Sequence, residues 1–380
     1  MKLLYYDVSK IISDKEERLN LKKKKMLRNT ILCSAAALLL VASLTACGNQ
    51  DDTSSVVSEE SAPSSVAEVK YENINPLTGE NNLATSAKGQ RPIAFMINNN
   101  PNARPHWGLC SADVVIEGLV EGGSTRMMWL FSDVSNVPKI GSLRSMRHDF
   151  VEIADGFDAV LVHWGGSPQA YTSVSTNGVD ELDGLSYEGS YFFRDNTRNV
   201  AIEHTGYTTG ENILTLMEQK EIETKANSQY ASPFTFGKPN EKRTLTDGTC
   251  KQVDVFFSTA GYNHTFTYDE SDGLYYNSIE GTPMKDDNGQ QMAVTNVIGL
   301  YMNVSTIAGD GSGRVDMDLS GGEGFYISNG TYETITWKKG NTPSNPLKLY
   351  DKNGNELVLN AGKSWIGLLP ENYSENTVIA

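Results

Sequence analysis

The chain has 380 residues, with 47 Asp and Glu against 32 Lys and Arg. A net charge of −15 gives a surface that repels nucleic acid and anionic lipid, so the sequence argues against a nucleic-acid partner. Any anion-binding site in this protein must therefore be a local positive pocket. The four cysteines show no metal-type spacing, and a disulfide between Cys110 and Cys250 is allowed but not implied.

Residues 1–46 predict a lipoprotein signal peptide. A basic region through Thr30 precedes the apolar run Ile31–Ala46, which is shorter than the ~18 residues that a membrane-spanning helix needs. Small residues followed by Cys47 resemble the bacterial lipobox, which implies cleavage before Cys47 and a lipid on its thiol. An uncleaved N-terminal anchor is the alternative interpretation, and Met26 is an alternative start.

Residues 47–70 predict a lipidated cysteine followed by a disordered tether. Gln50–Lys70 is rich in Ser and acidic residues and contains no Phe or Trp. Such a segment cannot bury enough apolar surface to fold. It would hold the folded part close to the outer face of the membrane, at an r.m.s. distance on the order of 25 Å.

About 310 residues follow the tether, too many for one ordinary core, and two domains are therefore expected. Residues 71–225 predict an α+β domain, and residues 226–380 predict a β-rich domain without a catalytic signature. In the second domain Asp316 and Asp318 alternate with apolar residues and indicate the solvated face of a strand. The predicted strands there are Val253–Phe257, Thr265–Tyr268, Leu274–Asn277, Val297–Val304, Arg314–Leu319, Gly324–Ile327, Tyr332–Trp337, Leu347–Tyr350, Glu356–Leu359 and Ser364–Leu368.

In the first domain a helix is predicted over Leu143–Asp155. Apolar residues recur there at helical spacing, Ser142 is a good N-cap and Gly156 is a plausible stop. Arg144 and Arg147 then lie in the first two turns, where the free backbone N–H groups disfavour cations. Two arginines in this position indicate a bound anion.

A glycine loop follows the next predicted strand, Asp158–Trp164. Ser167 would cap a second helix there, and glycine amides that lead into a helix start commonly hold phosphate or carboxylate. If the run Met127–Phe131 forms a strand parallel to Asp158–Trp164, the two helix starts meet at one edge of the sheet in a βαβ unit. The predicted ligand-binding residues are Arg144, Arg147, Gly165, Gly166 and Ser167, with His163 and Arg126 nearby.

The same residues allow a purely structural interpretation, in which the two arginines only pair with internal carboxylates. The candidate partners are Glu117, Glu121 and Asp149. Glu117 and Glu121 share one face in a predicted hairpin over residues 114–131, with backbones roughly 13 Å apart. This separation exceeds the ~5 to 9.5 Å of glycosidase carboxyl pairs and disfavours a hydrolytic pair.

Other chemistry receives less support. Pro168 lacks the N–H that a nucleophile elbow lends to its oxyanion hole, which disfavours a serine hydrolase at Ser167. His163 suits a core histidine better than a general base. The charged segment Phe193–Arg198 is interpreted as a solvated turn with ion pairs. No metal and no cofactor are predicted, because the histidines lack ligand spacing; those considered are His106, His148, His163 and His204.

Several motifs together resemble the YerB-like lipoproteins of Gram-positive bacteria. They are NPLTGE (Asn75–Glu80), RPIAFMINN, ARPHWGL, EGLVEGGSTR (Glu117–Arg126), IGSLRSMR, HWGGSP, TWKKG and GKSWIGLLP (Gly362–Pro370). The resemblance covers nearly all of residues 71–370. It implies an α+β fold, with a layered α/β N-terminal domain that contains a mixed sheet and a βαβ unit, followed by a β-rich C-terminal domain. It assigns no activity and no catalytic residues.

The resulting hypothesis is a protein that is lipid-anchored through Cys47 on the extracellular face of the cytoplasmic membrane of a Gram-positive bacterium. Its N-terminal domain is predicted to bind an anionic cell-envelope ligand that bears phosphate or carboxylate groups. Two alternatives stay open. One is a hydrolase or transferase that acts on an envelope glycan or phosphodiester at the same place, and the other is a scaffold that docks an envelope protein.

Overall fold

The computed structural model describes residues 71–227, 232–340 and 342–380. The predicted signal peptide, the lipidation site Cys47 and the tether lie outside the described residues. All described residues belong to one compact unit. Among them, no helix combines the length and the apolar character needed to cross a membrane.

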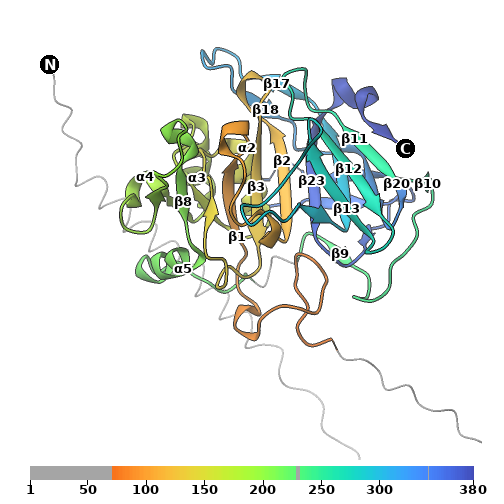
Figure 1. Cartoon of the computed structure of the whole chain (residues 1–380), viewed down its shortest axis with the longest axis horizontal. Helices are drawn as coiled ribbons and strands as arrows, with labels where there is room; N and C mark the ends of the chain where they lie inside the picture. The colour runs from red at the N-terminus through yellow and green to blue at the C-terminus, as the bar shows by residue number, and fades with distance from the viewer. Residues whose placement is uncertain (1–70, 228–231, 341) are drawn as a thin grey trace, which may run out of the picture. The chain divides into compact units, whose positions relative to one another are not determined.

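An 11-stranded mixed sheet forms the centre of the fold (Figure 1). From the first half of the chain it contains β1 (Ile93–Asn98), β2 (Val114–Leu119), β3 (Thr125–Phe131), β5 (Val160–His163) and β6 (Glu181–Asp183). From the second half it contains β10 (Gly248–Thr249), β16 (Asn296–Met302), β19 (Gly322–Ser328), β20 (Thr331–Lys338), β21 (Lys348–Tyr350) and β23 (Ser364–Pro370). The order is β10-β20-β19-β16-β23-β2-β3-β1-β5-β6, and β21 pairs with β20.

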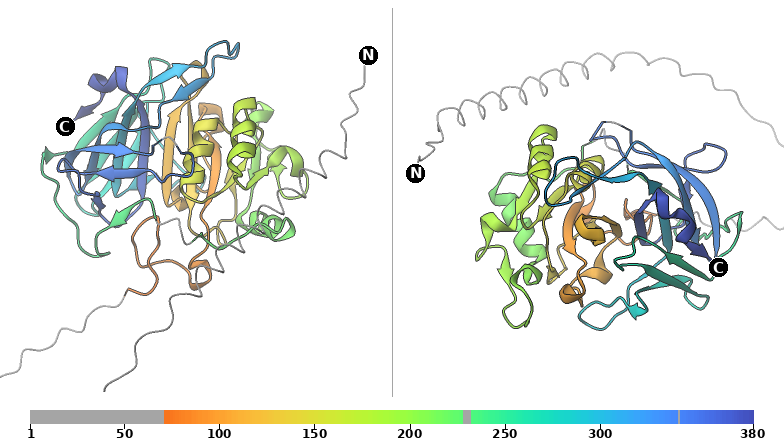
Figure 2. Two further views of the ribbon diagram at one scale, coloured as in Figure 1. Left: turned by 180° about the vertical axis from the view of Figure 1, so that it is seen from behind. Right: turned by 90° about the horizontal axis from the view of Figure 1, so that it is seen from above.

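Strand β23, from near the end of the chain, lies between β2 and β16 and is parallel to both. Strands from both halves of the sequence therefore belong to one sheet. In Figure 2 the helices of the green segment gather towards one end of this sheet, and the teal and blue strands lie towards the other. The domain boundary predicted at residues 225 and 226 stays a prediction.

The predicted hairpin over residues 114–131 is confirmed, because β2 and β3 are antiparallel. The predicted parallel partner of β5 is wrong. Met127–Phe131 belongs to β3, which is antiparallel to β1, whereas β1 is the strand parallel to β5. The βαβ unit of this fold is β5, helix α3 (Pro168–Asn177) and β6, since β5 and β6 are parallel neighbours.

Helix α2 runs over His148–Gly156 and begins five residues later than predicted. The segment before it is extended, because its backbone groups pair elsewhere and cannot close helical turns. The N–H of Arg144 donates to the carbonyl oxygen of Met96 at 2.9 Å, and the N–H of Met146 donates to that of Gly165 at 3.0 Å. Arg147 is consequently the N-cap residue of α2. The prediction for α3 is confirmed, with Ser167 as its N-cap and Pro168 at its start.

Two apolar cores lie on the two faces of the central sheet. Helix α2 packs on one face, where Met96, Met128 and Phe150 belong to the same buried cluster. The opposite face packs against a six-stranded sheet, in which Phe266 and Tyr275 share a cluster with residues of the central sheet. That second sheet contains β11 (Gln252–Val255), β12 (His264–Asp269), β13 (Leu274–Ile279), β14 (Thr282–Pro283), β15 (Ala293–Val294) and β24 (Val378–Ile379).

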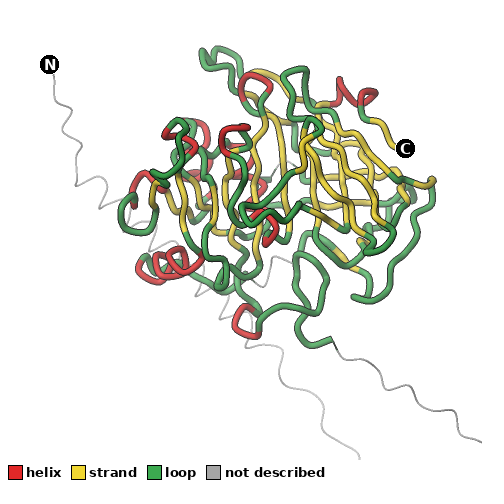
Figure 3. The backbone as a smooth tube through the Cα atoms, in the orientation of Figure 1, coloured by secondary structure: helices red, strands yellow, loops and turns green. Residues whose placement is uncertain are grey.

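Figure 3 shows that strands and loops predominate over helices in this fold. All ten strands predicted for the second half of the chain coincide with observed strands, at least in part. The remaining strands are β4 (Ile140–Gly141), β7 (Phe193–Arg194), β8 (Gly206–Thr208), β9 (Thr235–Phe236), β17 (Val304–Thr306), β18 (Val315–Met317) and β22 (Val358–Leu359). The remaining helices are α4 (Gly184–Tyr187), α5 (Gly210–Gln219) and the 3-10 helices η1 (Thr85–Ala87), η2 (Pro101–Ala103), η3 (Leu109–Ser111), η4 (Glu121–Gly123), η5 (Ile202–His204) and η6 (Glu371–Asn376).

Candidate functional site

The arginines predicted to bind an anion lie at the edge of the central sheet where β1, β2 and β5 end and β3 begins. Arg126 is the second residue of β3 and pairs with Asn98, the last residue of β1. The segment with Arg144 runs beside the loop after β5, since the carbonyl oxygen of Arg144 accepts the N–H of Trp164 at 3.1 Å. The fold thus brings together segments that the sequence placed at one sheet edge.

Arg147 is engaged within the protein. Its Nε donates to Oε2 of Glu121 at 3.0 Å, its Nη2 donates to Oε1 of the same carboxylate, and its Nη1 donates to the Met146 carbonyl oxygen at 2.9 Å. Burial alone would raise the pKa of Glu121, but hydrogen bonds and the charge of Arg147 hold that pKa at about 2. The bidentate pair is one of the internal pairs that the structural interpretation expects.

Arg126 is buried beside that pair. Its Nη1 donates to the carbonyl oxygen of Ser145 at 2.5 Å, and its Nε has no hydrogen-bond partner among the described residues. Burial, together with the like charges of Arg147 and Arg144, lowers the pKa of Arg126 to about 9, against the opposing effect of Glu121. The guanidinium of Arg126 is therefore a buried cation with two other cations close to it.

Arg144 differs from its two neighbours because its guanidinium donates no hydrogen bond to the described residues. Its closest carboxylate is that of Glu203, with Nη2 and Oε1 3.9 Å apart, and 32% of the Arg144 side chain is exposed. Burial lowers the pKa of Arg144; Glu203 opposes the change, and Arg147 adds to it. Arg144 therefore presents an accessible planar fork of donors, the geometry that recognises carboxylate and phosphate.

The glycine loop is largely occupied by its own chain. The N–H of Gly165 donates to Oδ1 of Asp183 at 2.8 Å, and the hydroxyl of Ser167 accepts the N–H of Ala170 at 3.1 Å. A Cβ atom at Gly166 would lie 2.9 Å from the side chain of Met146. The Met146 side chain therefore fills the space next to this loop. The amides of this loop consequently serve α3 and α4 rather than an open cradle.

His163 is buried and held at both ring nitrogens. Its Nδ1 lies 2.9 Å from the carbonyl oxygen of Gly165, and its Nε2 lies 2.8 Å from Oε2 of Glu181. Both partners carry acceptor oxygens, so each ring nitrogen already has a polar partner within the protein. This arrangement fits a histidine that fixes the loop to β6, and it leaves no ring nitrogen available for a substrate.

Glu117 pairs on the opposite face of the sheet with a histidine that the sequence did not indicate. Its Oε1 accepts from the side chains of Asn99 at 2.8 Å and Thr125 at 2.6 Å, and its Oε2 lies 3.0 Å from Nε2 of His264. Both partners of this ion pair are buried. Burial would raise the pKa of Glu117, but His264 and these hydrogen bonds lower it. No local signal could have linked two residues on different sheets.

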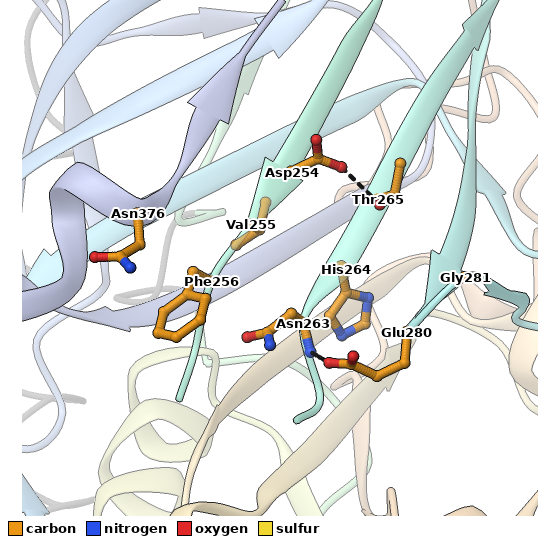
Figure 4. A pocket seen from close by; sticks show the side chains of 9 residues that line it. All are labelled: Asp254, Val255, Phe256, Asn263, His264, Thr265, Glu280, Gly281 and Asn376. Atoms are coloured by element: carbon orange, nitrogen blue, oxygen red, sulfur yellow. Dashed lines mark hydrogen bonds between the residues drawn. The ribbon is translucent and has the colours of Figure 1, made fainter. Parts of the chain in front are cut away.

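A shallow pocket of about 270 Å³ opens next to His264 (Figure 4). Figure 4 shows Asn263 and Glu280 at its rim, where the N–H of Asn263 donates to Oε1 of Glu280 at 2.9 Å.

A second cavity, of about 340 Å³, is lined by Cys110 and Lys363 among others. Cys110 and Cys250 are free thiols, and burial raises the pKa of each to about 11. Neither cavity includes the arginines.

The charged segment after α4 contains internal ion pairs, as the solvated-turn interpretation expects. Arg194 pairs with Glu188 at 3.1 Å and stacks over the ring of Trp164 at 3.9 Å, while Asp195 pairs with Lys139 at 2.9 Å.

One other cluster has the chemistry of metal ligands. Its members are His148, Asp149 and Asp316.

Comparison with known proteins identifies the fold and the family. The models described as "Protein of unknown function (DUF3048)" match with an N-terminal domain over residues 77–223 and a C-terminal domain over residues 253–366. A protein named "Putative lipoprotein YerB" from Bacillus subtilis (strain 168) is 32% identical over 318 residues, 82% of this chain and 90% of that protein. The crystal structure of YerB from Bacillus subtilis matches with a TM-score of 0.70 at 30% identity, over 80% of this chain and 99% of that chain.

These matches confirm the resemblance and the α+β fold with a β-rich C-terminal half. The family models also carry no assigned activity. On sequence identity, coverage and fold together, the chain belongs to the YerB family of proteins of unknown function, with both its N-terminal and its C-terminal DUF3048 domains.

Proposed function

We propose that this protein is a lipid-anchored extracellular protein that binds an anionic cell-envelope ligand through Arg144. The observation that carries the proposal is the accessible Arg144 guanidinium, which donates no hydrogen bond to the described residues and has its closest carboxylate 3.9 Å away. A guanidinium in a partly buried position normally finds acceptors. A phosphate or carboxylate on the ligand would supply them.

The charge balance around Arg144 supports the same ligand class. Arg144 and Arg147 lie close enough to Arg126 to lower its pKa, and Arg147 also lowers the pKa of Arg144, while Glu121 is in direct contact with Arg147. Because Glu121 already accepts two hydrogen bonds from Arg147, it leaves the other two charges poorly compensated. A bound anion would relieve the repulsion, and Arg126 would add attraction from behind Arg144.

Anchoring is supported by the leader and by the relative. The apolar run Ile31–Ala46 followed by Cys47 fits a lipoprotein signal, and the related Bacillus subtilis protein carries the word lipoprotein in its name. The acidic tether over residues 50–70 would keep the folded part near the membrane, where envelope polymers that bear phosphate or carboxylate groups are within reach.

The contacts favour binding over the two alternatives. A hydrolase or transferase that used His163 as its acid or base would need a free ring nitrogen, and both ring nitrogens of His163 are already engaged. A pure scaffold would need all the arginines to be paired, as Arg147 is with Glu121. Arg144 is the residue that departs from the scaffold interpretation.

The test is titration calorimetry of the full chain in detergent at low ionic strength, with inorganic phosphate, pyrophosphate and a short polyol-phosphate oligomer. Arg144→Gln is expected to weaken binding roughly 10- to 100-fold, because a charge-assisted hydrogen bond contributes about 1.5–3 kcal/mol. Arg314→Gln is the matched control, since 24% of the Arg314 side chain is exposed, compared with 32% for Arg144. Equal loss in both variants, or no binding to any of the three ligands, would refute the proposal.

A further inference from the structure

We propose that His148, Asp149 and Asp316 form a binding site for a divalent transition-metal ion of the zinc class. This site is separate from the proposed anion site and does not depend on it. His148 and Asp149 are the first two residues of α2, and Asp316 is the central residue of β18. Figure 1 labels α2 and β18 close together at the upper side of the fold, where the two elements are in contact.

The three side chains offer one imidazole nitrogen and two carboxylates to one point. Nε2 of His148 lies 2.8 Å from Oδ1 of Asp316 and 3.4 Å from Oδ1 of Asp149, and the candidate ligand atoms all lie within 4.8 Å of one another. Metal–ligand bonds of about 2.0–2.2 Å in a tetrahedral site place ligand atoms roughly 3.3–3.5 Å apart. Small side-chain movements would therefore be enough to admit an ion.

A second, independent observation points to a missing partner. Asp149 is 2% exposed, and its Oδ1 accepts the N–H of Met317 at 2.9 Å. Its Oδ2 is buried and has no hydrogen-bond partner among the described residues. A buried carboxylate oxygen without a partner is unfavourable, because it has lost water without replacement. A cation bound by Asp149 would replace that lost interaction.

The donor set identifies the class of ion. Imidazole nitrogen combined with carboxylate oxygen suits zinc and its neighbours in the first transition row, whereas calcium and magnesium prefer sites built from oxygen alone. Two carboxylates balance the charge of a divalent ion when the imidazole is neutral. Three protein ligands leave one position of a tetrahedral ion open to solvent, which the 60% exposure of the Asp316 side chain permits.

A bound ion would have a structural consequence. Asp149 and His148 lie in the segment that matches the N-terminal family domain, and Asp316 lies in the segment that matches the C-terminal one. The ion would join helix α2 to the hairpin of β17 and β18, whose strands pair in register from Val304 to Thr306. His148 also lines an open cavity of about 450 Å³ along α3, so the site is accessible from solvent.

The experiment uses the full chain in detergent, freed of metal with a chelator and titrated with Zn²⁺ by calorimetry. One Zn²⁺ per chain is expected, with binding weakened at least about tenfold in His148→Gln and in Asp316→Asn. The exposed position of Asp316 makes misfolding of its variant improbable on physical grounds, so that variant keeps the test valid if His148→Gln does not fold. Cobalt is the second probe, because a tetrahedral Co²⁺ site gives visible absorption bands.

Asp318→Asn is the matched control, because Asp318 is the next exposed aspartate along the same segment and its Oδ1 accepts the N–H of Ser320. It should bind Zn²⁺ as the parent does. Loss of binding in Asp318→Asn as large as in Asp316→Asn would show diffuse attraction to acidic surface and would overturn the site. Absence of stoichiometric Zn²⁺ binding to the parent would also overturn it, and His148 would then be only a polar contact between α2 and β18.

Arg144→Gln separates this inference from the proposed function. That variant should keep full Zn²⁺ affinity while it loses phosphate, and Asp316→Asn should keep phosphate affinity while it loses Zn²⁺. If Asp316→Asn lost both ligands, the two sites would not be independent as stated here.

Discussion

Glu117 and Glu121 belong to the same hairpin, yet the charged side chains around them differ in how many of their hydrogen-bonding atoms have partners. Glu117 accepts hydrogen bonds from three side chains, those of Asn99, Thr125 and Trp365, and its Oε2 lies 3.0 Å from Nε2 of the buried His264. Arg147 is the side chain that donates to the carboxylate of Glu121, while Arg126 and Arg144 beside it keep unused donors. Both carboxylate oxygens of Glu117 accept hydrogen bonds within the protein, although Nε2 of His264 lies 3.0 Å away without a well-aligned hydrogen bond, whereas the carboxylate nearest to Arg144 is 3.9 Å away.

The difference separates a structural cluster from a binding site in physical terms. A buried acid with all its acceptors used stabilises the packing of the two sheets, because removing any member leaves an unpaired group in the core. A group of arginines with more donors than acceptors costs stability, and such groups persist where a ligand completes them. The comparison therefore predicts opposite effects of substitutions on the two sides of the sheet.

The largest expected effect is in Glu117→Ala. Removal of the buried carboxylate leaves the donors of Asn99, Thr125 and Trp365 without their acceptor, so a loss of about 3–5 kcal/mol in the free energy of unfolding is expected. Urea unfolding monitored by tryptophan fluorescence measures it, since Trp365 lies beside this pair. Glu323→Ala is the control, because Glu323 is exposed on β19 and should change stability by less than about 0.5 kcal/mol. Equal stability of the two variants would contradict the structural role of Glu117.

Local features of the fold were predictable because their causes lie within a few residues. Ser167 and Pro168 specify the start of α3, and the turn Asp272-Gly273 specifies the hairpin of β12 and β13. The position of β23 between β2 and β16 was not predictable, because that pairing joins residues far apart in the sequence. The start of α2 was also missed, since long-range backbone hydrogen bonds of Arg144 and Met146 override the local helical spacing.

The same limit applies to the sites. The sequence placed Arg144 and Arg147 at the sheet edge beside the loop after β5, although the helix start used in that argument lies five residues later in the structure. It could not show that Arg147 is hydrogen-bonded to Glu121 whereas Arg144 has only the more distant Glu203, since this depends on the placement of the two carboxylates. The alternation around Asp316 correctly indicated an exposed face, but the contact with His148 joins residues 168 positions apart and has no local signal.

In the arginine cluster around Glu121, Arg126→Met is expected to leave the free energy of unfolding unchanged or to raise it by up to about 1 kcal/mol. Its Nε has no partner among the described residues, and burial lowers the pKa of Arg126 to about 9, so the folded state disfavours this charge. Urea unfolding at pH 7 measures the change, and phosphate titration should show weaker binding in the same variant.

Arg147→Met is the contrasting control for that prediction. Because it breaks the bidentate contact with Glu121, we expect it to lower stability by about 1–3 kcal/mol. If Arg126→Met were as destabilising as Arg147→Met, Arg126 would be a satisfied structural residue, and the contrast between the two sides of the sheet would fail.

An effect that is also limited to about 1 kcal/mol should appear in the pH dependence of Glu121→Gln. The pKa of Glu121 in the folded state is about 2, below the ordinary value of 4.5, so the carboxylate contributes stability above pH 4.5 that is lost as the pH falls towards 2. Because 32% of the Glu121 side chain is exposed, solvent screening limits the contribution to about 1 kcal/mol at pH 7. Urea unfolding from pH 7 to pH 3 should show the parent and Glu121→Gln converging as the pH falls, whereas a constant difference would mean that the carboxylate charge contributes nothing.

At pH 7 the variant also releases Arg147 from its partner, and tighter phosphate binding by Glu121→Gln would show that the internal carboxylate competes with the ligand for the same arginines.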